Sequence, residues 1–174
     1  MSYYGNFKRV LDIFIAIAAM VILSPVLVAI VITARLSSKG PAIFKQERAG
    51  KNGKPFVFYK FRTMKLEVDP FGPSPKSGQD SRLTKVGKFL REFSLDELPQ
   101  LFNVLKGDMS IIGPRPLYIS QIPEWSERQK KRLLVKPGLT GSAQIHGRAE
   151  LTREEKLELD VKYVETATLL ADIR

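Results

Sequence analysis

The apolar segment from Val10 to Ala34 constrains the fold of this chain more than any other feature of its sequence. Only Asp12, Ser24 and Thr33 interrupt it with polar side chains. A helix needs about 20 predominantly apolar residues to cross a bilayer, so the segment is long enough. It is too long for a signal-peptide core, and no small-residue cleavage site follows it. The sequence therefore predicts a membrane segment near the start of the chain.

The Ser24-Pro25 pair in the middle of this segment leaves two topologies open. Pro25 lacks an N–H group and clashes with the carbonyl four residues back, so it kinks or breaks a helix. Each half then extends roughly 18 Å, whereas the hydrocarbon core is about 30 Å thick. The Ser24 hydroxyl is placed to bond a carbonyl that the proline frees. A kinked span and a re-entrant helix-break-helix both fit these residues.

Basic residues flank the segment on both sides, and the positive-inside rule places both flanks in the cytoplasm. These residues are Lys8, Arg9, Arg35 and Lys39. A re-entrant path satisfies this rule together with the short half-helices. Asp12 would lie at headgroup depth, one turn from Lys8 and Arg9, either of which is a candidate partner for it.

The remainder of the chain reads as one cytoplasmic domain, residues 40–174, after a membrane unit of residues 1–39. Residues 43–48 and 56–62 are β-prone, and the Asn52-Gly53 pair between them predicts a hairpin. Residues 66–81 are rich in Pro, Gly and Ser and predict a surface loop. Helices are expected at 82–93, 97–105, about 124–134 and from 152 to near the end. The expected fold class is α+β and predominantly helical, with a re-entrant helix-break-helix, a small hairpin and amphipathic interfacial helices.

The helix expected at 82–93 is amphipathic, and two positions fit it equally well. One face carries Leu83, Val86, Phe89, Leu90 and Phe93, and the basic residues lie elsewhere. Such a helix either lies in the membrane interface or packs on the domain core with its basic face in water.

Composition narrows the chemistry without choosing a function. The formal net charge of +10 favours polyanionic partners such as nucleic acid, anionic lipid or phosphorylated substrates. The chain has no cysteine and a single histidine, His146, which exclude a thiol nucleophile and a Cys or His metal cluster. Any metal is therefore expected to be a hard cation with oxygen ligands. His146 by itself reads as a polar loop or surface residue.

The stretch from Ser94 to Gln100, SLDELPQ, is the most informative candidate for chemistry. Its structural reading is a helix start, because Ser94 and Glu97 have capping-box spacing and Asp96 is the better N-cap if the helix continues through Pro99. In either case Asp96 lies at the positive end of a helix, where a carboxylate or a phosphate is stabilised.

Two later segments carry arginines in conformationally restricted surroundings. Pro114 and Pro116 fix the backbone on either side of Arg115, and a rigid guanidinium suits bidentate phosphate binding. A turn with a solvated arginine is the alternative reading. Arg148 follows a glycine in the loop-like segment 136–148, which is a weak signal alone. No G-x-x-x-x-G-K-[ST] or G-x-G-x-x-G motif is present in the sequence.

Taken in order, these motifs resemble the monotopic phosphoglycosyl transferases, also called the bacterial sugar transferase family. The matching elements cover almost the whole chain, and the block from SLDELPQ to GPRP is highly specific. They are Lys8-Arg9-x-x-Asp12, Ser24-Pro25, IFKQERAG, YKFRTM, TKVGKFLR, SLDELPQLFNVLKGDMSIIGPRP, VKPGLTGSAQIHGR and EEKLELDVKYV.

The resemblance implies a re-entrant helix broken at Ser24-Pro25 and a catalytic domain on the cytoplasmic face of the bacterial inner membrane. It implies a UDP-sugar donor, undecaprenyl phosphate as acceptor, Mg²⁺ as cofactor and release of UMP. The Asp of the family's Asp-Glu dyad attacks the β-phosphorus, and it matches Asp96, with Glu97 as its partner and both as magnesium ligands. The substrate-binding residues expected near this dyad are Lys60, Arg91, Arg115 and Arg148.

The physical chemistry of these residues agrees with the implied activity. An ionised Asp is a competent phosphoryl nucleophile, and Mg²⁺ usually binds through one or two carboxylates plus phosphates. A covalent step also means that the soluble donor and the lipid acceptor need not occupy the site together. Three features depart from the family: Ser142 replaces a large residue, His146 replaces Asn, and members commonly continue beyond Arg174. The first two leave the identity of the sugar open.

Other functions explain less of the sequence. A nucleic-acid module would account for the net charge but not for the apolar segment, so no nucleic-acid partner is expected. A membrane scaffold would account for that segment but not for SLDELPQ. The basic surface fits docking to anionic membrane lipids and a homodimer contact equally well, and a sequential mechanism is the alternative to a covalent one.

Overall fold

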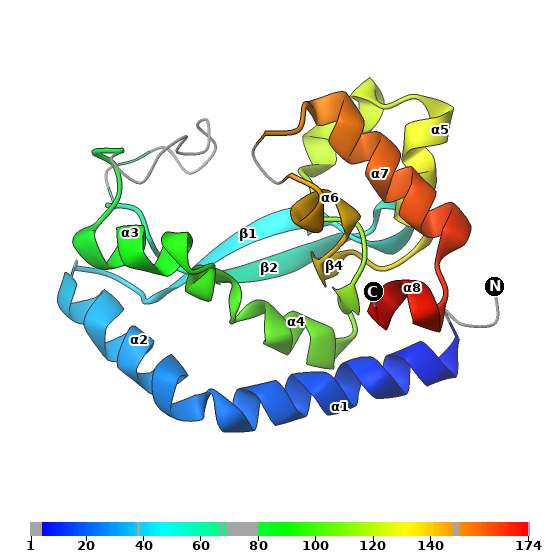
Figure 1. Ribbon diagram of the computed structural model, residues 1–174. Helices are drawn as coiled ribbons and strands as arrows, with labels where there is room; N and C mark the ends of the chain where they lie inside the picture. Colours follow the sequence, from blue (N-terminus) through cyan, green and yellow to red (C-terminus); the bar gives the residue numbers. More distant parts are fainter. Residues whose placement is uncertain (1–4, 38, 67, 69–79, 148–149, 174) are drawn as a thin grey trace.

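The computed structural model describes residues 5–37, 39–66, 68, 80–147 and 150–173 (Figure 1). The longer helices are α1 (Asn6–Ile22), α2 (Ser24–Ser37), α3 (Lys85–Glu92), α4 (Gln100–Lys106) and α7 (Arg153–Thr166). Short helices are α5 (Glu127–Lys130), α6 (Ser142–Ile145) and α8 (Leu169–Ile173), with 3-10 turns η1 (Lys51–Gly53), η2 (Leu95–Glu97), η3 (Ile119–Glu124) and η4 (Lys131–Leu134). The strands are β1 (Ile43–Ala49), β2 (Pro55–Phe61), β3 (Ser110–Ile112) and β4 (Gly138–Thr140). The predicted α+β class, mostly helical with small sheets, is confirmed.

Helices α1 and α2 form a bent bar along one side of the molecule (Figure 1). They meet at Leu23 with a bend of 65°, and the Ser24 hydroxyl donates to the Val21 carbonyl oxygen at 2.8 Å. Pro25 falls in the first turn of α2, where its missing N–H group has no helical partner to lose. Among the described residues, no single helix has the length and apolar composition to cross a membrane, whereas this bent pair together does.

The predicted hairpin is confirmed as the antiparallel pair β1 and β2. Its register runs from Ile43 opposite Phe61 to Ala49 opposite Pro55. Asn52 has φ 57° and Gly53 has φ 73°, so both residues of the Asn-Gly pair adopt the left-handed conformation that these residue types tolerate best.

Strand β2 supplies the aromatic side chains of both core clusters. Phe56 and Phe58 pack against Ala16 of α1 and Val104 of α4. At the other end of the strand, Phe61 packs against α2 and α3. Its buried neighbours there are Ile30 and Leu90. The hairpin is therefore the layer on which both halves of the bent helix pair rest.

Asn103 of α4 covers the free edge of β2. Its side-chain oxygen accepts from the Tyr59 N–H group at 3.2 Å, and its amide nitrogen donates to the Val57 carbonyl at 2.6 Å. Asn103 is fully buried, so these bonds satisfy strand groups that would otherwise lack partners away from water. This pairing fixes α4 beside the strand.

Helix α1 is attached to the rest of the protein through its polar residues. The Asp12 carboxylate is 4% exposed and accepts from the Ser110 hydroxyl at 3.0 Å and the Ile111 N–H group at 2.9 Å. Arg9 donates to the carbonyl oxygens of Val104 and Leu105 in the last turn of α4. No ion pair joins Asp12 to Lys8 or Arg9 among the described residues, so their pairing was wrongly predicted.

Lys8, a flanking basic residue and a candidate partner of Asp12 in the sequence, pairs with a different carboxylate. It is buried and forms an ion pair with Asp172 of α8 at 2.5 Å. The beginning of α1 is thereby fixed to the last helix of the chain.

Several helix boundaries differ from the predicted ones. Helix α4 begins at Gln100 rather than 97, and Ser94 makes no capping bond, so the predicted capping box with Glu97 is wrong. Asp96 lies inside η2 instead of at an N-cap. The capping boxes that form are those of Ser126 and Thr152. The region 124–134 contains short helical turns, and the last region divides into α7 and α8.

The two faces of α3 also depart from the simple amphipathic pattern. Leu90 is buried, but Phe89 is 55% exposed and Phe93 is 59% exposed. These two rings contact each other with centroids 4.8 Å apart. Part of the apolar face therefore packs on the core and part lies at the surface.

The Asp12 contacts lead to a prediction about stability. We expect Asp12→Ala to lower the free energy of unfolding by about 2 to 4 kcal/mol, because it leaves a buried hydroxyl and a buried N–H group without an acceptor. Asp12→Asn retains an acceptor oxygen and should lose less. Thermal unfolding of the three proteins in the same neutral detergent measures this, and equal stability of Asp12→Ala and wild type would contradict it.

Candidate active site

The Asp96-Glu97 pair lies in a tight turn between α3 and α4. Ser94 has φ 56° and reverses the chain at the end of α3, which a non-glycine residue adopts only when its surroundings hold it there. The 3-10 turn η2 follows and presents both carboxylates to the hairpin. Asp96 is 5% exposed, although the side chain is charged and short. A carboxylate so buried requires a functional or electrostatic explanation.

Glu97 is held by two cations from different parts of the chain. Lys60 of β2 places its ammonium nitrogen 2.8 Å from one carboxylate oxygen of Glu97. The guanidinium of Arg115 binds both oxygens, with Nη1 at 3.1 Å from Oε2 and Nη2 on Oε1. Fork-shaped pairing of this kind is among the strongest charge-assisted interactions in proteins. Both oxygens of Glu97 thus have cationic partners.

Asp96 is buried beside this cluster, but its carboxylate is not held by hydrogen bonds from the described cations as that of Glu97 is. The Lys60 ammonium lies 3.7 Å from its Oδ2, a distance typical of an ion pair without a hydrogen bond. No hydrogen bond to the Asp96 carboxylate is seen within the described part of the chain. Its oxygens therefore retain lone pairs for another ligand.

The two adjacent carboxylates have opposite pKa shifts. Burial raises the pKa of Asp96 above its usual value and outweighs the attraction of Lys60, while repulsion from Glu97 adds to the rise. Burial would also raise the pKa of Glu97, but Arg115 and Lys60 outweigh it and lower that pKa to about 2. Glu97 is therefore the permanently ionised member, and Asp96 is the more basic one.

Further cations surround the pair from neighbouring elements. Arg91 of α3 donates to the Thr63 hydroxyl at 2.9 Å and lies within electrostatic range of Asp96. Arg48 of β1 stacks on the ring of Tyr118 at 3.6 Å and donates to Gln46. Burial lowers the pKa of Arg48, and the charges of Arg115 and Glu97 act on it. Cationic side chains thus outnumber carboxylates around the dyad, which favours a further anion.

A second layer of contacts holds the backbone of Arg115. Gly113 packs directly on the neighbouring strand, since a Cβ atom there would lie 2.7 Å from the Lys136 carbonyl oxygen. Arg132 donates to the Arg115 carbonyl oxygen and to Asp160, and its guanidinium lies 4.9 Å from the Trp125 ring centroid. Arg132 and Asp160 are each 3% exposed, so this is a buried and paired contact.

The structure brings together most of the residues predicted from the sequence. Lys60, Arg91 and Arg115 gather around Asp96 and Glu97, whereas Arg148 lies outside the described residues. His146 is exposed at the end of α6, with Nδ1 2.8 Å from the Ser142 carbonyl oxygen, which confirms the surface reading.

Sequence reasoning missed the supporting arginines. Arg48 lies within the strand pattern IFKQERAG, and Arg132 within a helical segment with several basic residues. The only available signal for Arg48 was its place on a strand that pairs with the strand of Lys60. Nothing in the pattern around Arg132 separates it from solvated neighbours.

The carboxylate oxygens of the dyad fit a magnesium ion whose other ligands are phosphates and water. The described residues contain no group of three or more His, Cys, Asp or Glu side chains placed to hold a metal. The dyad alone offers hard carboxylate oxygens, with free lone pairs on Asp96. Mg²⁺ commonly binds through one or two carboxylates and completes its shell with phosphates and water, so this set is sufficient.

Comparison with known proteins decides the family. A model of the bacterial sugar transferase family matches residues 3–174. The chain belongs to the bacterial sugar transferase family. It is 46% identical over 167 residues to the uncharacterized sugar transferase EpsL of Bacillus subtilis, which covers 96% of this chain and 82% of that protein.

Two longer relatives carry names that state an activity. The chain is 43% identical over 175 residues to the UDP-glucose:undecaprenyl-phosphate glucose-1-phosphate transferase of Escherichia coli, covering 96% of this chain and 38% of that protein. It is 42% identical over 179 residues to the galactosyl transferase CpsE of Streptococcus agalactiae, covering 96% and 40% respectively. The chain therefore spans less than half the length of these two bacterial sugar transferases.

The opposite pKa shifts predict opposite effects on stability at pH 7. The lowered pKa of Glu97 contributes stability above pH 4.5 that is lost as pH falls toward 2, so Glu97→Gln should cost on the order of 2 to 3 kcal/mol. The raised pKa of Asp96 means that ionisation opposes folding as pH rises through it, so Asp96→Asn should be at least as stable as wild type.

Chemical denaturation at pH 7 and at pH 4 measures both effects. The gap between wild type and Glu97→Gln should narrow at the lower pH. A strongly destabilised Asp96→Asn variant would show that the Asp96 carboxylate supports the fold.

Proposed function

We propose that this bacterial sugar transferase moves a phosphosugar from a UDP-sugar to undecaprenyl phosphate through a covalent intermediate on Asp96, with release of UMP. The observation that carries the proposal is the pair of adjacent carboxylates held in different electrostatic states. Glu97 is locked by Arg115 and Lys60, while Asp96 is buried, more basic and free of hydrogen-bond donors in the described part of the chain. The names of the E. coli and other relatives supply the donor and acceptor classes.

Asp96 has the properties of a phosphoryl nucleophile. An oxygen of its carboxylate attacks the β-phosphorus, the P–O bond to UMP breaks, and UMP leaves with the bonding electrons. An oxygen of the lipid phosphate then attacks the same phosphorus, the bond to Asp96 breaks, and the carboxylate is restored. Burial supports this role because a desolvated carboxylate with a raised pKa is a stronger nucleophile when ionised.

The neighbouring cations stabilise the charges of donor and transition state. Lys60, Arg91 and Arg115 surround the place where a diphosphate must lie to reach Asp96, and Arg48 adds a further positive charge. Glu97 fixes Lys60 and Arg115 in position before substrate arrives, so little reorganisation is needed. In this proposal Glu97 acts mainly by positioning these two cations.

Magnesium is proposed as the cofactor. Asp96 and Glu97 would hold it together with the donor phosphates, and when bound it offsets negative charge on the diphosphate. The residues already described bind and orient the donor around it.

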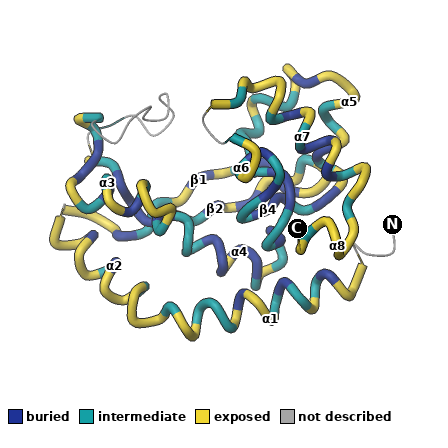
Figure 2. Tube along the Cα trace, in the orientation of Figure 1, coloured by how far each residue is buried: buried dark blue, intermediate teal, exposed yellow. Residues whose placement is uncertain are grey.

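A re-entrant topology is proposed for α1 and α2 in the bacterial inner membrane, with the catalytic domain on the cytoplasmic face. The outward faces of these helices are apolar and largely exposed (Figure 2). On α1 they include Val10, Phe14 and Val21 at 63, 71 and 68% exposure. Exposed apolar surface of this extent is typical of contact with lipid.

The attachment of both ends of the bent pair supports the same topology. Lys8 at the start of α1 is paired with α8, and Ile30 of α2 packs with Phe61 of β2. Both ends therefore rest on one domain, whereas a spanning path would separate them by the thickness of a bilayer, about 30 Å. A re-entrant hairpin also brings the lipid acceptor to the domain that holds Asp96.

Intact-protein mass spectrometry tests the covalent mechanism. We expect wild type with Mg²⁺ and a panel of UDP-sugars, without lipid acceptor, to gain the mass of one phosphosugar. Asp96→Asn should gain none, because it removes the attacking charge with little change in shape. The donor that produces the adduct identifies the sugar.

Matched controls make this measurement decisive. Glu158→Gln removes an exposed carboxylate of α7 that pairs with Arg128, away from the dyad, and should form the adduct normally. An adduct on Asp96→Asn would assign the nucleophile to another residue. Transfer by wild type to undecaprenyl phosphate, with no adduct and no UMP release in its absence, would favour a sequential mechanism.

Cysteine labelling tests the topology, since the natural chain contains no cysteine. We expect single substitutions Gly5→Cys and Lys39→Cys to react with an impermeant maleimide from the cytoplasmic side only, in inverted membrane vesicles. Right-side-out vesicles should leave both unlabelled. Labelling of the two positions from opposite sides would establish a span instead.

A further inference from the structure

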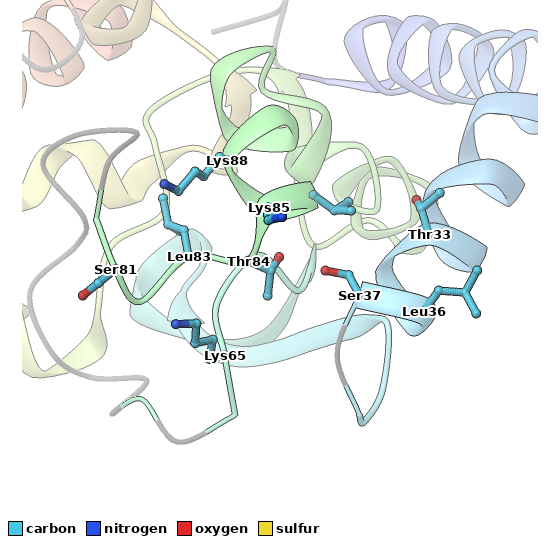
Figure 3. Close-up of a pocket in the computed structure, with 10 residues that line it drawn as sticks. Thr33, Leu36, Ser37, Lys65, Ser81, Leu83, Thr84, Lys85 and Lys88 are labelled. Atoms are coloured by element: carbon cyan, nitrogen blue, oxygen red, sulfur yellow. The ribbon is translucent and has the colours of Figure 1, made fainter.

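A basic cavity lies away from the dyad, between the end of α2 and the beginning of α3 (Figure 3). Its volume is about 840 Å³, and it is open to the surface. Three of its lining residues are lysines, Lys65, Lys85 and Lys88, and four carry hydroxyl groups. The hydroxyl residues are Thr33, Ser37, Ser81 and Thr84, and apolar walls come from Leu36, Leu83 and Val86.

The described residues show no intramolecular role for the three lysines of this cavity. Lys65 and Lys85 are exposed and Lys88 is half-buried, and within the described ranges none of the three has a carboxylate partner, whereas Lys60 and Arg115 at the dyad both do. Three like charges around one opening repel each other, so the arrangement favours a bound anion. The hydroxyl groups of Ser37 and Ser81 add hydrogen-bonding capacity for oxygen atoms.

The apolar wall indicates what carries that anion. Leu36 is 82% exposed at the end of α2 and lines the same cavity as the lysines. On the same side of the molecule, α2 exposes Val28 and Ile32 at 58 and 53%. A ligand that fits both features has an anionic headgroup joined to an apolar tail.

We propose that this cavity binds the phosphodiester headgroup of an anionic phospholipid, with the acyl chains lying along the outer face of α2. The proposal rests on the membrane topology proposed above, because it requires the end of α2 to lie at headgroup depth. Lys65, Lys85 and Lys88 pair with the phosphodiester and any further headgroup charge, and Ser37 and Ser81 donate to its oxygens.

The position of the cavity distinguishes this ligand from the lipid acceptor. An acceptor phosphate must reach a phosphosugar on Asp96, yet none of the dyad or its cations lines the cavity. Lys85 begins α3, a helix of eight residues that extends about 12 Å, and Asp96 lies four residues beyond the other end of this helix. A phosphate held by the lysines is therefore a non-reacting one.

Thr63 connects this cavity to the candidate active site. The Thr84 side chain, which lines the cavity, lies 3.4 Å from the Thr63 carbonyl oxygen, and Arg91 binds the Thr63 hydroxyl. A bound headgroup would therefore hold the segment that orients Arg91, besides fixing the angle of the domain on the bilayer.

Native mass spectrometry of the full chain in neutral detergent tests the site, because neutral micelles have no surface potential to attract lipid nonspecifically. Short-chain phosphatidylglycerol is the probe, and phosphatidylcholine is the zwitterionic control. We expect one phosphatidylglycerol retained per chain and weaker retention of phosphatidylcholine. The double variant Lys65→Gln/Lys88→Gln should bind phosphatidylglycerol about 30-fold more weakly, at about 1 kcal/mol for each lysine.

The double variant Arg35→Gln/Lys39→Gln is the matched control, since it removes two charges from the same end of α2 outside the cavity lining. It should change binding less than about 3-fold, given the distance dependence of charge interactions in water. A second variant, Ser37→Phe, fills the opening without changing charge and should also reduce retention. Equal losses of phosphatidylglycerol binding in the two double variants would show that net charge, and not this cavity, determines binding. That result would overturn the proposal.

Two further readouts separate this proposal from the proposed function. The lysine double variant should still form the phosphosugar adduct on Asp96 in detergent, so a missing adduct in wild type would count against the function and not against this site. Undecaprenyl phosphate should not displace phosphatidylglycerol at equimolar concentration. One-for-one displacement would instead make the cavity the acceptor site and overturn the assignment to phospholipid.

Discussion

The attachment of α1 through Asp12 and Arg9 is the constraint on which the placement of the whole domain depends. An apolar helix would ordinarily turn its few polar side chains toward water. Here Asp12 accepts two hydrogen bonds from β3, and Arg9 occupies the carbonyl groups at the end of α4. Because α4 is itself held to β2 by Asn103, a single chain of contacts joins the apolar helix to the hairpin. The apolar outer face of α1 remains exposed, so it is available for contact with surroundings other than the domain core.

The same hairpin determines the electrostatics of the dyad. Lys60 extends from β2 to Glu97, and Arg115 reaches the same carboxylate from the loop after β3. Their combined attraction lowers the pKa of Glu97 despite the opposing effect of burial. Asp96 receives less of this attraction, so burial raises its pKa. Adjacent residues of one type thus acquire different chemistry from their contacts alone. In the proposed reaction, this difference in pKa distinguishes Asp96, the nucleophile, from Glu97, which positions the cations.

The two proposals place two phosphate-binding regions in this arrangement, and these regions differ in how their cations are paired. Around the dyad, Lys60 and Arg115 are paired with Glu97 and positioned before substrate arrives. The lysines around the outer cavity have no carboxylate partners among the described residues, and they lie beside an exposed apolar helix end. Helix α3 links the regions, with Lys85 at its beginning, Lys88 in its middle and Arg91 near its end. In the two proposals, membrane contact and donor binding therefore involve one short helix.

The sequence by itself determined the features that depend on neighbours along the chain. The Asn52-Gly53 turn and its strands, the break at Ser24-Pro25 and the capping of α7 follow from local backbone preferences. The long SLDELPQ to GPRP block was sufficient to indicate the family. Only the tertiary structure decided that Asp12 binds Ser110 and Ile111, that Glu97 rather than Asp96 is locked, and that Arg132 holds Arg115. These contacts join residues from 17 to 99 positions apart, and no local pattern ranks one distant partner above another, because burial and mutual charge appear only when the chain has folded.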